Sequence, residues 1–284
     1  MNKAVSHRPS RLPGRMLGEF AVVLLTLILF GVPFLFVIFQ AGKTTKEAAV
    51  MALIPPAAAQ YGVNFLEVIR TADGMVLRAF VNSTLITGLS IAVLVLVAAM
   101  AGFVLERRSG RGSRLAQFLI LAGLMIPPSV VTTIWVLQRT GLYRTMVGMI
   151  LIEVALAFPF SVLMYRAFTV SIPREIDEAS IIDGCGGTEL FFRIILPLLK
   201  PATSTVAILS AVTIFNDFVN PLYFFPGAKN ATVQLTLYNF MSQFSTKWNL
   251  LFANVLVISI PPLLFFIVFN RKIVEGMVAG AVKG

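Results

Sequence analysis

Six long apolar stretches constrain the fold of this chain more than any other feature. Each is about 20 residues long, the length that an α-helix needs to cross the hydrocarbon core of a bilayer. The stretches are 20–39, 84–105, 115–137, 146–165, 202–225 and 250–269. Mean hydropathy over the 284 residues is +0.88, and only 13% are charged, about half the share found in soluble domains. The sequence therefore predicts an all-α membrane protein, a single domain over 1–284 with six transmembrane helices.

The Lys and Arg residues predict how this chain is oriented. The N-terminal tail, 106–114, 166–200 and the C-terminal tail together hold 15 of them, whereas 40–83, 138–145 and 226–249 hold 8. Basic residues concentrate in cytoplasmic loops. Both termini are therefore expected in the cytoplasm, in a multi-pass protein whose first span is retained and not cleaved as a signal. The net charge of +10 then reflects topology and contact with anionic lipid, and nucleic acid is not an expected partner.

Several kinds of chemistry are disfavoured by what the sequence lacks. It has one cysteine, Cys185, and one histidine, His7, in the polar N-terminal tail. An intrachain disulfide, a cysteine metal site and a Ser/His dyad within the membrane are therefore not expected. The sequence also has no G-x-x-x-x-G-K-[ST] phosphate loop. We expect no catalytic residues, no metal site and no cofactor bound by this chain, which argues against an intramembrane enzyme.

An acidic segment between the fourth and fifth stretches stands apart from the apolar chain. Five of the 13 acidic residues fall within 15 positions there, namely Glu175, Asp177, Glu178, Asp183 and Glu189. Ser171 is expected to cap a first helix with Pro173 in its first turn, and Thr188 a second. The glycines between them are expected to break the chain into helix, turn and helix. From the residues alone, a solvated amphipathic loop explains the segment as well as a docking surface does.

The same segment carries a motif with fixed spacing. Glu178-Ala179-Ser180, three residues, Gly184, nine residues, Ile194, one residue and Leu196-Pro197 resemble the EAA motif of ABC importer permeases. The chain departs from that pattern only by Ser180 in place of the second alanine. The resemblance implies that 171–200 is a cytoplasmic coupling segment between spans four and five that contacts an ATPase subunit. The residues assigned to it are Glu178, Ala179, Ser180, Asp183, Gly184, Ile194, Leu196 and Pro197.

Further stretches resemble the carbohydrate-type permeases of that family, near the maltose-type second permease subunit. They are "FVNSTLITG", "IFNDFVNPLYFF" and "RKIVEGMVAGAVKG". Phe215 stands where that group usually carries Trp, so no particular sugar is indicated. The resemblance implies a bacterial plasma membrane location and four kinds of partner: a homologous second permease, two ATPase subunits holding ATP and Mg, an extracytoplasmic solute-binding protein, and membrane lipid. Glu178 would face a basic group on the ATPase.

Polar residues inside the apolar stretches are candidates for a translocation path, because such residues usually face a bundle interior or a cavity. They are Glu153 in the fourth stretch and Asn216, Asp217 and Asn220 in the fifth. Hydrogen bonding between helices would explain them as well. The alternative function is a stand-alone secondary transporter or channel, but no inverted repeat or filter sequence supports it.

Overall fold

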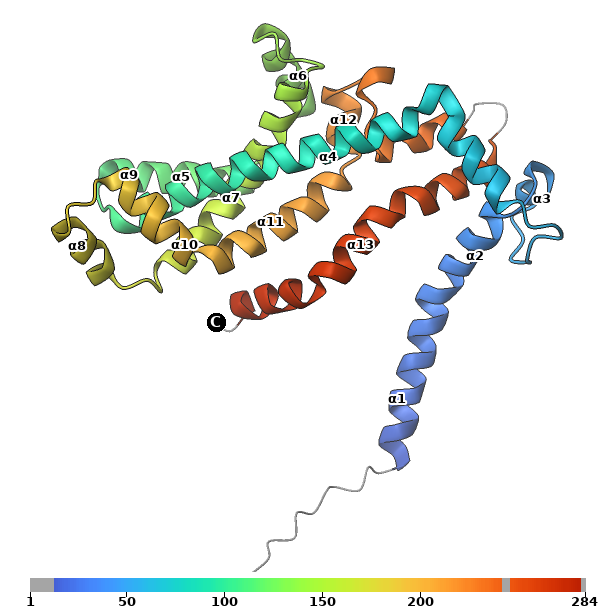
Figure 1. Cartoon of the computed structure of the whole chain (residues 1–284), viewed down its shortest axis with the longest axis horizontal. Helices are drawn as coiled ribbons and strands as arrows, with labels where there is room; N and C mark the ends of the chain where they lie inside the picture. Colours follow the sequence, from blue (N-terminus) through green and yellow to red (C-terminus); the bar gives the residue numbers. More distant parts are fainter. Residues whose placement is uncertain (1–12, 242–245, 282–284) are drawn as a thin grey trace, which may run out of the picture. The chain divides into compact units, whose positions relative to one another are not determined.

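Within 13–241 and 246–281, the ranges that the computed structural model describes, all regular secondary structure is helical (Figure 1). This confirms the predicted all-α class. His7 and the rest of the N-terminal tail lie outside the described residues, as does the extreme C-terminus. The chain divides into two compact units. The first comprises Met1–Val68 and Phe240–Val257, and the second Ile69–Asn239 and Ile258–Gly284. The single domain over 1–284 stays a prediction.

The first unit begins with a long apolar helix. α1 (Pro13–Thr26), the π-helical turn η1 (Leu27–Gly31) and α2 (Val32–Ala41) follow one another directly. Most of its large apolar side chains are exposed, Phe20 by 68% for example. An apolar helix with an exposed apolar surface suits a lipid environment. The predicted first span, 20–39, lies within it.

A buried polar cluster holds the chain that follows α2. The amide nitrogen of Asn64 donates to the carbonyl oxygens of Ala41 and Lys43, at 2.8 and 2.9 Å, and its amide oxygen accepts from Asn249 at 3.1 Å. These bonds satisfy backbone groups that would otherwise be buried without partners. The short helix α3 (Thr45–Ala49) then begins with a capping box between Thr44 and Glu47. Hydrogen bonds from the backbone N–H and hydroxyl of Thr44 lower the pKa of Glu47.

α4 (Tyr61–Arg107) is interrupted near its start. Thr71–Gly74 are not helical, and φ is positive at Ala72, Asp73 and Gly74. The helix before this break lies, like α3, within the connecting segment 40–83. The predicted second span, 84–105, lies in the long part after the break.

Two of the predicted spans are interrupted in the second unit. The stretch 115–137 comprises α5 (Arg111–Met125) and α6 (Val130–Arg139), separated where Pro127 and Pro128 withhold backbone donors. The stretch 202–225 comprises α11 (Lys200–Phe215) and α12 (Val219–Phe224), separated at 216–218. Each of these two predicted stretches thus consists of two helices and not one. By contrast, α7 (Met146–Thr169) runs unbroken through the predicted fourth span despite Pro159.

The remaining elements lie between and after these helices in the sequence. They are α8 (Arg174–Ile182), α9 (Gly187–Glu189), the π-helical turn η2 (Leu190–Ile195), α10 (Leu196–Leu198), the 3-10 turns η3 (Ala228–Asn230) and η4 (Gln234–Phe240), and α13 (Trp248–Ala281).

Not every predicted span is a single long helix. Among the described residues, three helices are long and apolar enough to cross a membrane, Gly18–Ala41, Tyr61–Arg107 and Met146–Thr169. A fourth crossing is possible through the bent pair Gly187–Leu198 and Lys200–Phe215, and Trp248–Leu264 is a shorter apolar helix. The chain thus has candidate spans, and the count of six stays a prediction.

The largest core cluster lies in the second unit, where α4, α7, η2 and α11 meet. Its fully buried side chains include Leu94, Val162, Tyr165 and Ile195. The Tyr165 hydroxyl donates to the Thr203 hydroxyl at 3.0 Å and so links α7 to α11. This core joins the acidic segment rigidly to the apolar helices.

Candidate functional site

The acidic segment folds as the sequence predicts in outline. α8 is followed by a turn at 183–186 and by a second helical stretch from α9 to α10. Its detail differs from expectation, because α8 begins after Pro173 without a side-chain cap and the Ser171 hydroxyl donates instead to the carbonyl oxygen of Phe168. Thr188 is not a cap either, since Gly186 precedes α9 and no side chain caps it. Both predicted caps were therefore wrong.

A Schellman motif ends α8. The N–H of Cys185 donates to the carbonyl oxygen of Ser180, and the N–H of Gly184 to that of Ile181, both at 3.0 Å. The motif needs a residue in the left-handed region, and Gly184 takes φ +86°. A side chain at this position would strain the turn, which explains physically why the motif has glycine here.

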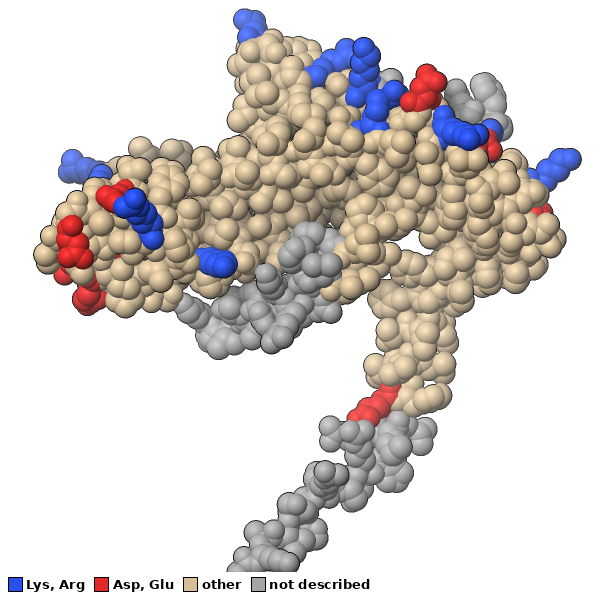
Figure 2. All heavy atoms as spheres, viewed as in Figure 1, with Lys and Arg blue, Asp and Glu red and all other residues tan. Residues whose placement is uncertain are grey.

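The tip of α8 presents an apolar pair surrounded by carboxylates. Ile181 and Ile182 are 60% and 85% exposed, and Glu175, Glu178 and Asp183 are exposed beside them. Figure 2 shows acidic side chains gathered at the end of the second unit where α8 lies. An exposed apolar pair with a charged rim is the composition of a protein docking surface. We call these five residues the α8 tip.

The other two carboxylates of the segment are used internally. Asp177 accepts from Nε of Arg107 at 2.5 Å, and both side chains are only 13% exposed. Nη2 of Arg107 also donates to the carbonyl oxygen of Ile172 at 2.9 Å. Glu189 pairs with Arg193 on the next turn. Asp177 thus binds α8 to the end of α4. Part of the acidic cluster therefore stabilises the fold.

A second link joins the ends of α4 and α7. Nε of Arg166 donates to the Glu106 carboxylate at 2.8 Å, and Arg174 reaches the Glu106 carbonyl oxygen at 3.5 Å. The helix ends are therefore bound to one another next to α8. A push on α8 would be passed on to α4 and α7 through these contacts.

The downstream motif residues lie on the path from α8 to α11. Ile194 and Leu196 are half-buried and Pro197 is exposed, while the neighbouring Ile195 is fully buried in the core cluster. The helical stretch 187–198 meets α11 at 74°. Ala179 is exposed, whereas Ser180 is buried and its hydroxyl donates to the carbonyl oxygen of Ile176 at 2.6 Å. The Ser180 side chain therefore faces the protein interior.

Three of the four candidate path residues come together. Glu153, Asp217 and Asn220 line one cavity of about 400 Å³ between α7 and α11, which we call the Glu153 cavity. The Glu153 carboxyl group lies next to the side chains of Asp217 and Asn220. Asp217 is itself held in place, accepting from the backbone N–H groups of Val219 and Asn220 at 2.9 and 3.2 Å.

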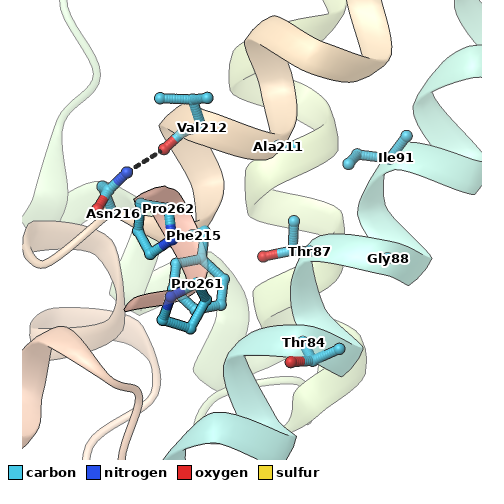
Figure 3. A pocket seen from close by; sticks show the side chains of 10 residues that line it. All are labelled: Thr84, Thr87, Gly88, Ile91, Ala211, Val212, Phe215, Asn216, Pro261 and Pro262. Atoms are coloured by element: carbon cyan, nitrogen blue, oxygen red, sulfur yellow. Dashed lines mark hydrogen bonds between the residues drawn. The ribbon is translucent and has the colours of Figure 1, made fainter. Parts of the chain in front are cut away.

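Asn216 lies apart from these three. It lines a different cavity of about 290 Å³ whose walls are mostly apolar, with Thr87 and Ile91 from α4, Phe215 from α11 and Pro261 from α13 (Figure 3). Its amide nitrogen donates to the carbonyl oxygen of Val212 at 2.8 Å, and its amide oxygen accepts from Gln234 at 3.1 Å. Helical periodicity separates the two cavities, because 211, 212 and 215 face one side of α11 and 209, 210 and 213 the other.

Some lining residues were missed at the sequence level. Ser161, Ser210 and Thr213 line the Glu153 cavity, and Thr84 and Thr87 line the other. A signal was available in the predicted stretch 202–225, because Ser210, Thr213 and Asp217 recur there at the spacing of one helix face. Small hydroxyl residues are common in apolar helices, so this spacing alone does not distinguish a cavity from a packed interface.

Comparison with known proteins places the chain among transport proteins. Residues 94–277 match the family described as "Binding-protein-dependent transport system inner membrane component". The melibiose/raffinose/stachyose import permease protein MelC of Bacillus subtilis is 32% identical, over 73% of this chain and 76% of that protein. The probable ABC transporter permease protein YurM of the same organism is also 32% identical, over 72% and 69%. The diacetylchitobiose uptake system permease protein NgcG of Streptomyces coelicolor is 29% identical, over 93% and 87%.

Solved structures support the fold. The chain resembles a chain in the crystal structure of a bacterial ABC transporter involved in the import of the acidic polysaccharide alginate. The TM-score is 0.79 at 15% sequence identity, and the match covers 95% of this chain and 99% of the other. A second structure is of a bacterial alginate ABC transporter in complex with an alginate pentasaccharide-bound periplasmic protein, with a TM-score of 0.65, 16% identity and coverage of 92% and 96%. At such identities the likeness shows the fold alone.

Proposed function

Because this chain belongs to the family of binding-protein-dependent transport system inner membrane components, we propose that it forms half of the translocation path of an ATP-driven carbohydrate importer. The other half would be a homologous second permease. Two ATPase subunits would carry ATP and Mg, and an extracytoplasmic solute-binding protein would deliver the solute. This chain would couple ATPase motion to alternating access and would hold no cofactor of its own.

The proposed topology has six spans with both termini in the cytoplasm. The asymmetry of Lys and Arg between the two sets of connecting segments supports it. Spans three and five would then be broken helices. A broken helix is tolerated at membrane depth where it is buried in protein or lines a cavity, and the break at 216–218 lies beside the Glu153 cavity.

The substrate class rests on the relatives. Proteins named for the import of melibiose, raffinose, stachyose and diacetylchitobiose resemble this chain over most of its length. We therefore infer a carbohydrate or a related polyol-like solute. A disaccharide, an oligosaccharide, a sugar derivative and a glycerol-phosphate-type compound all fit this class.

The α8 tip is the observation that carries the coupling role. Its apolar pair and three carboxylates are exposed, while Asp177 and the buried residues behind it bind the tip to α4, α7 and α11. A surface that is exposed to a partner and firmly packed against α4, α7 and α11 is suited to transmit the movement of that partner to these helices. A stand-alone transporter or channel does not require such a surface.

The test is a pull-down of the detergent-solubilised chain coexpressed with its neighbouring genes. Wild type should retain an ATPase and a second permease. Glu178→Lys should shed the ATPase or abolish its stimulation by the binding protein, because the reversal places like charges across the interface.

Glu67→Lys is the matched control, with the same change of charge in the segment expected on the outer side. It removes an exposed pair with Lys247, at 3.1 Å, which is worth at most about 1 kcal/mol, and should leave the ATPase bound. If no ATPase copurifies with wild type in mild detergent, the chain acts alone and the proposal is wrong.

A further inference from the structure

The Glu153 cavity contains a polar group without a partner. Glu153 is only 4% exposed, and its Oε1 atom has no hydrogen-bond partner within the described part of the chain. An apolar interior penalises a carboxyl oxygen that accepts nothing. The residue nevertheless lines a cavity of about 400 Å³. Oε1 is itself shielded in this side-chain conformation, so a donor on a ligand would remove the penalty once the Glu153 carboxyl group turns toward the cavity.

Several of the other polar groups around the cavity already donate within the chain. The Ser161 hydroxyl donates to the carbonyl oxygen of Ala157 at 2.8 Å, and the Thr213 hydroxyl to that of Leu209 at 3.0 Å. The amide nitrogen of Asn220 donates to Oδ2 of Asp217 at 2.5 Å. These hydroxyl and carboxyl oxygens retain lone pairs, so they can still accept. The lining therefore offers several acceptors, and the Ser210 hydroxyl and the second N–H of Asn220 can donate as well.

The charge of the lining also determines which class of ligand fits the cavity. Two carboxyl groups, those of Glu153 and Asp217, and no Lys or Arg line the cavity. An anionic ligand would find no countercharge and would lie next to acidic groups. Phe160 and Leu156 supply an apolar wall, against which the C–H face of a sugar ring can pack. A hydroxyl-rich, uncharged ring meets both requirements.

We propose that the Glu153 cavity is a solute subsite in which Glu153 accepts hydrogen bonds from the hydroxyl groups of an uncharged sugar, and that it disfavours acidic sugars. This inference rests on the proposed import function and adds to it a residue that determines specificity. The proposed preference for uncharged sugars also distinguishes this chain from the transporter of similar fold, which is involved in the import of the acidic polysaccharide alginate. The fold is shared, whereas the cavity chemistry decides the solute.

The test uses a cysteine reporter in the cavity of the assembled transporter. Thr213 is exposed and lines the cavity, so Thr213→Cys is introduced together with Cys185→Ser, which removes the only native cysteine of this chain. The rate of modification by a small methanethiosulfonate reagent is measured with increasing melibiose, raffinose or diacetylchitobiose, and with digalacturonate as the acidic counterpart. At least one neutral sugar should slow the modification, and digalacturonate should not.

Variants at Glu153 then test the residue itself. Glu153→Met keeps the volume but removes the acceptors, and should raise the half-protecting concentration of the neutral sugar at least about tenfold, the cost of a lost hydrogen bond to a buried group. Glu153→Gln keeps a carbonyl acceptor and should stay within about threefold. Thr87→Val in the apolar cavity is the control and should not change the protection.

Three results would overturn the proposal. They are protection by none of the neutral sugars, protection by digalacturonate equal to theirs, and protection that Glu153→Met leaves unchanged. A reporter thiol that reacts in the isolated chain but is blocked in the complete complex without sugar would show that the second permease fills the cavity. In all of these cases a retained ATPase in the pull-down leaves the import function standing, so the two failures are distinguishable.

Discussion

Replacing Arg107 by methionine is expected to uncouple ATP hydrolysis from solute. Arg107 holds Asp177 at 2.5 Å and the Ile172 carbonyl oxygen at 2.9 Å, and its guanidinium lies 5.8 Å from the ring centroid of Phe103. Removing one partner of a buried ion pair costs about 3–5 kcal/mol, because the other charge stays buried alone. α8 would then lose its attachment to α4. Stimulation of the ATPase by loaded binding protein should fall at least about tenfold, measured on the reconstituted complex.

Two further variants separate this attachment from a general effect of charge. Arg193→Met removes an exposed pair with Glu189, in which Arg193 is 78% exposed, and a pair of this kind contributes about 0.3–0.5 kcal/mol. It should leave stimulation near wild type. The double variant Arg107→Met with Asp177→Leu removes both charges and should recover part of the assembly and stability. Normal stimulation in an assembled Arg107→Met complex would show that α8 does not depend on this attachment.

Replacing Gly102 by leucine is expected to prevent the second unit from packing. A Cβ atom at Gly102 of α4 would lie 2.7 Å from Cβ of Tyr165, 3.0 Å from the backbone nitrogen of Arg166 and 3.1 Å from the Val162 carbonyl oxygen. These atoms belong to the backbone of α7 or lie next to it, so rotation of a side chain cannot relieve the clash. Small residues permit such close helix packing in membranes. Overpacking costs about 1–3 kcal/mol where side chains can adjust, and more is expected here.

The measurement is the yield and the thermal stability of the solubilised chain. Gly102→Leu should lower both strongly, and Gly102→Ala should lower them less. Gly112→Leu is the matched control, because a Cβ atom at Gly112 of α5 meets nothing within 4 Å. A melting temperature of Gly102→Leu equal to that of Gly112→Leu would mean that α4 and α7 do not pack as closely as described.

The sequence alone was sufficient to predict the structural class of the protein and the helix–turn–helix outline of the acidic segment. Apolar stretches of about 20 residues with few charges determine a helical membrane protein, because the backbone must satisfy its own hydrogen bonds in lipid. The glycines after Asp183 determine a turn, since Gly184 takes a positive φ that other residues disfavour. Both properties are local, and neither depends on distant parts of the chain.

Only the tertiary structure distinguished residues of the same type from one another. The five clustered carboxylates have similar sequence contexts, yet Asp177 is turned inward to Arg107, 70 positions away, while Glu178 is exposed. Asn216 and Asp217 are adjacent in the break between α11 and α12, yet they line different cavities. The position of a polar side chain in the fold depends on which helices pack beside it. That packing is set by contacts such as Gly102 against Tyr165, which join residues far apart in the chain.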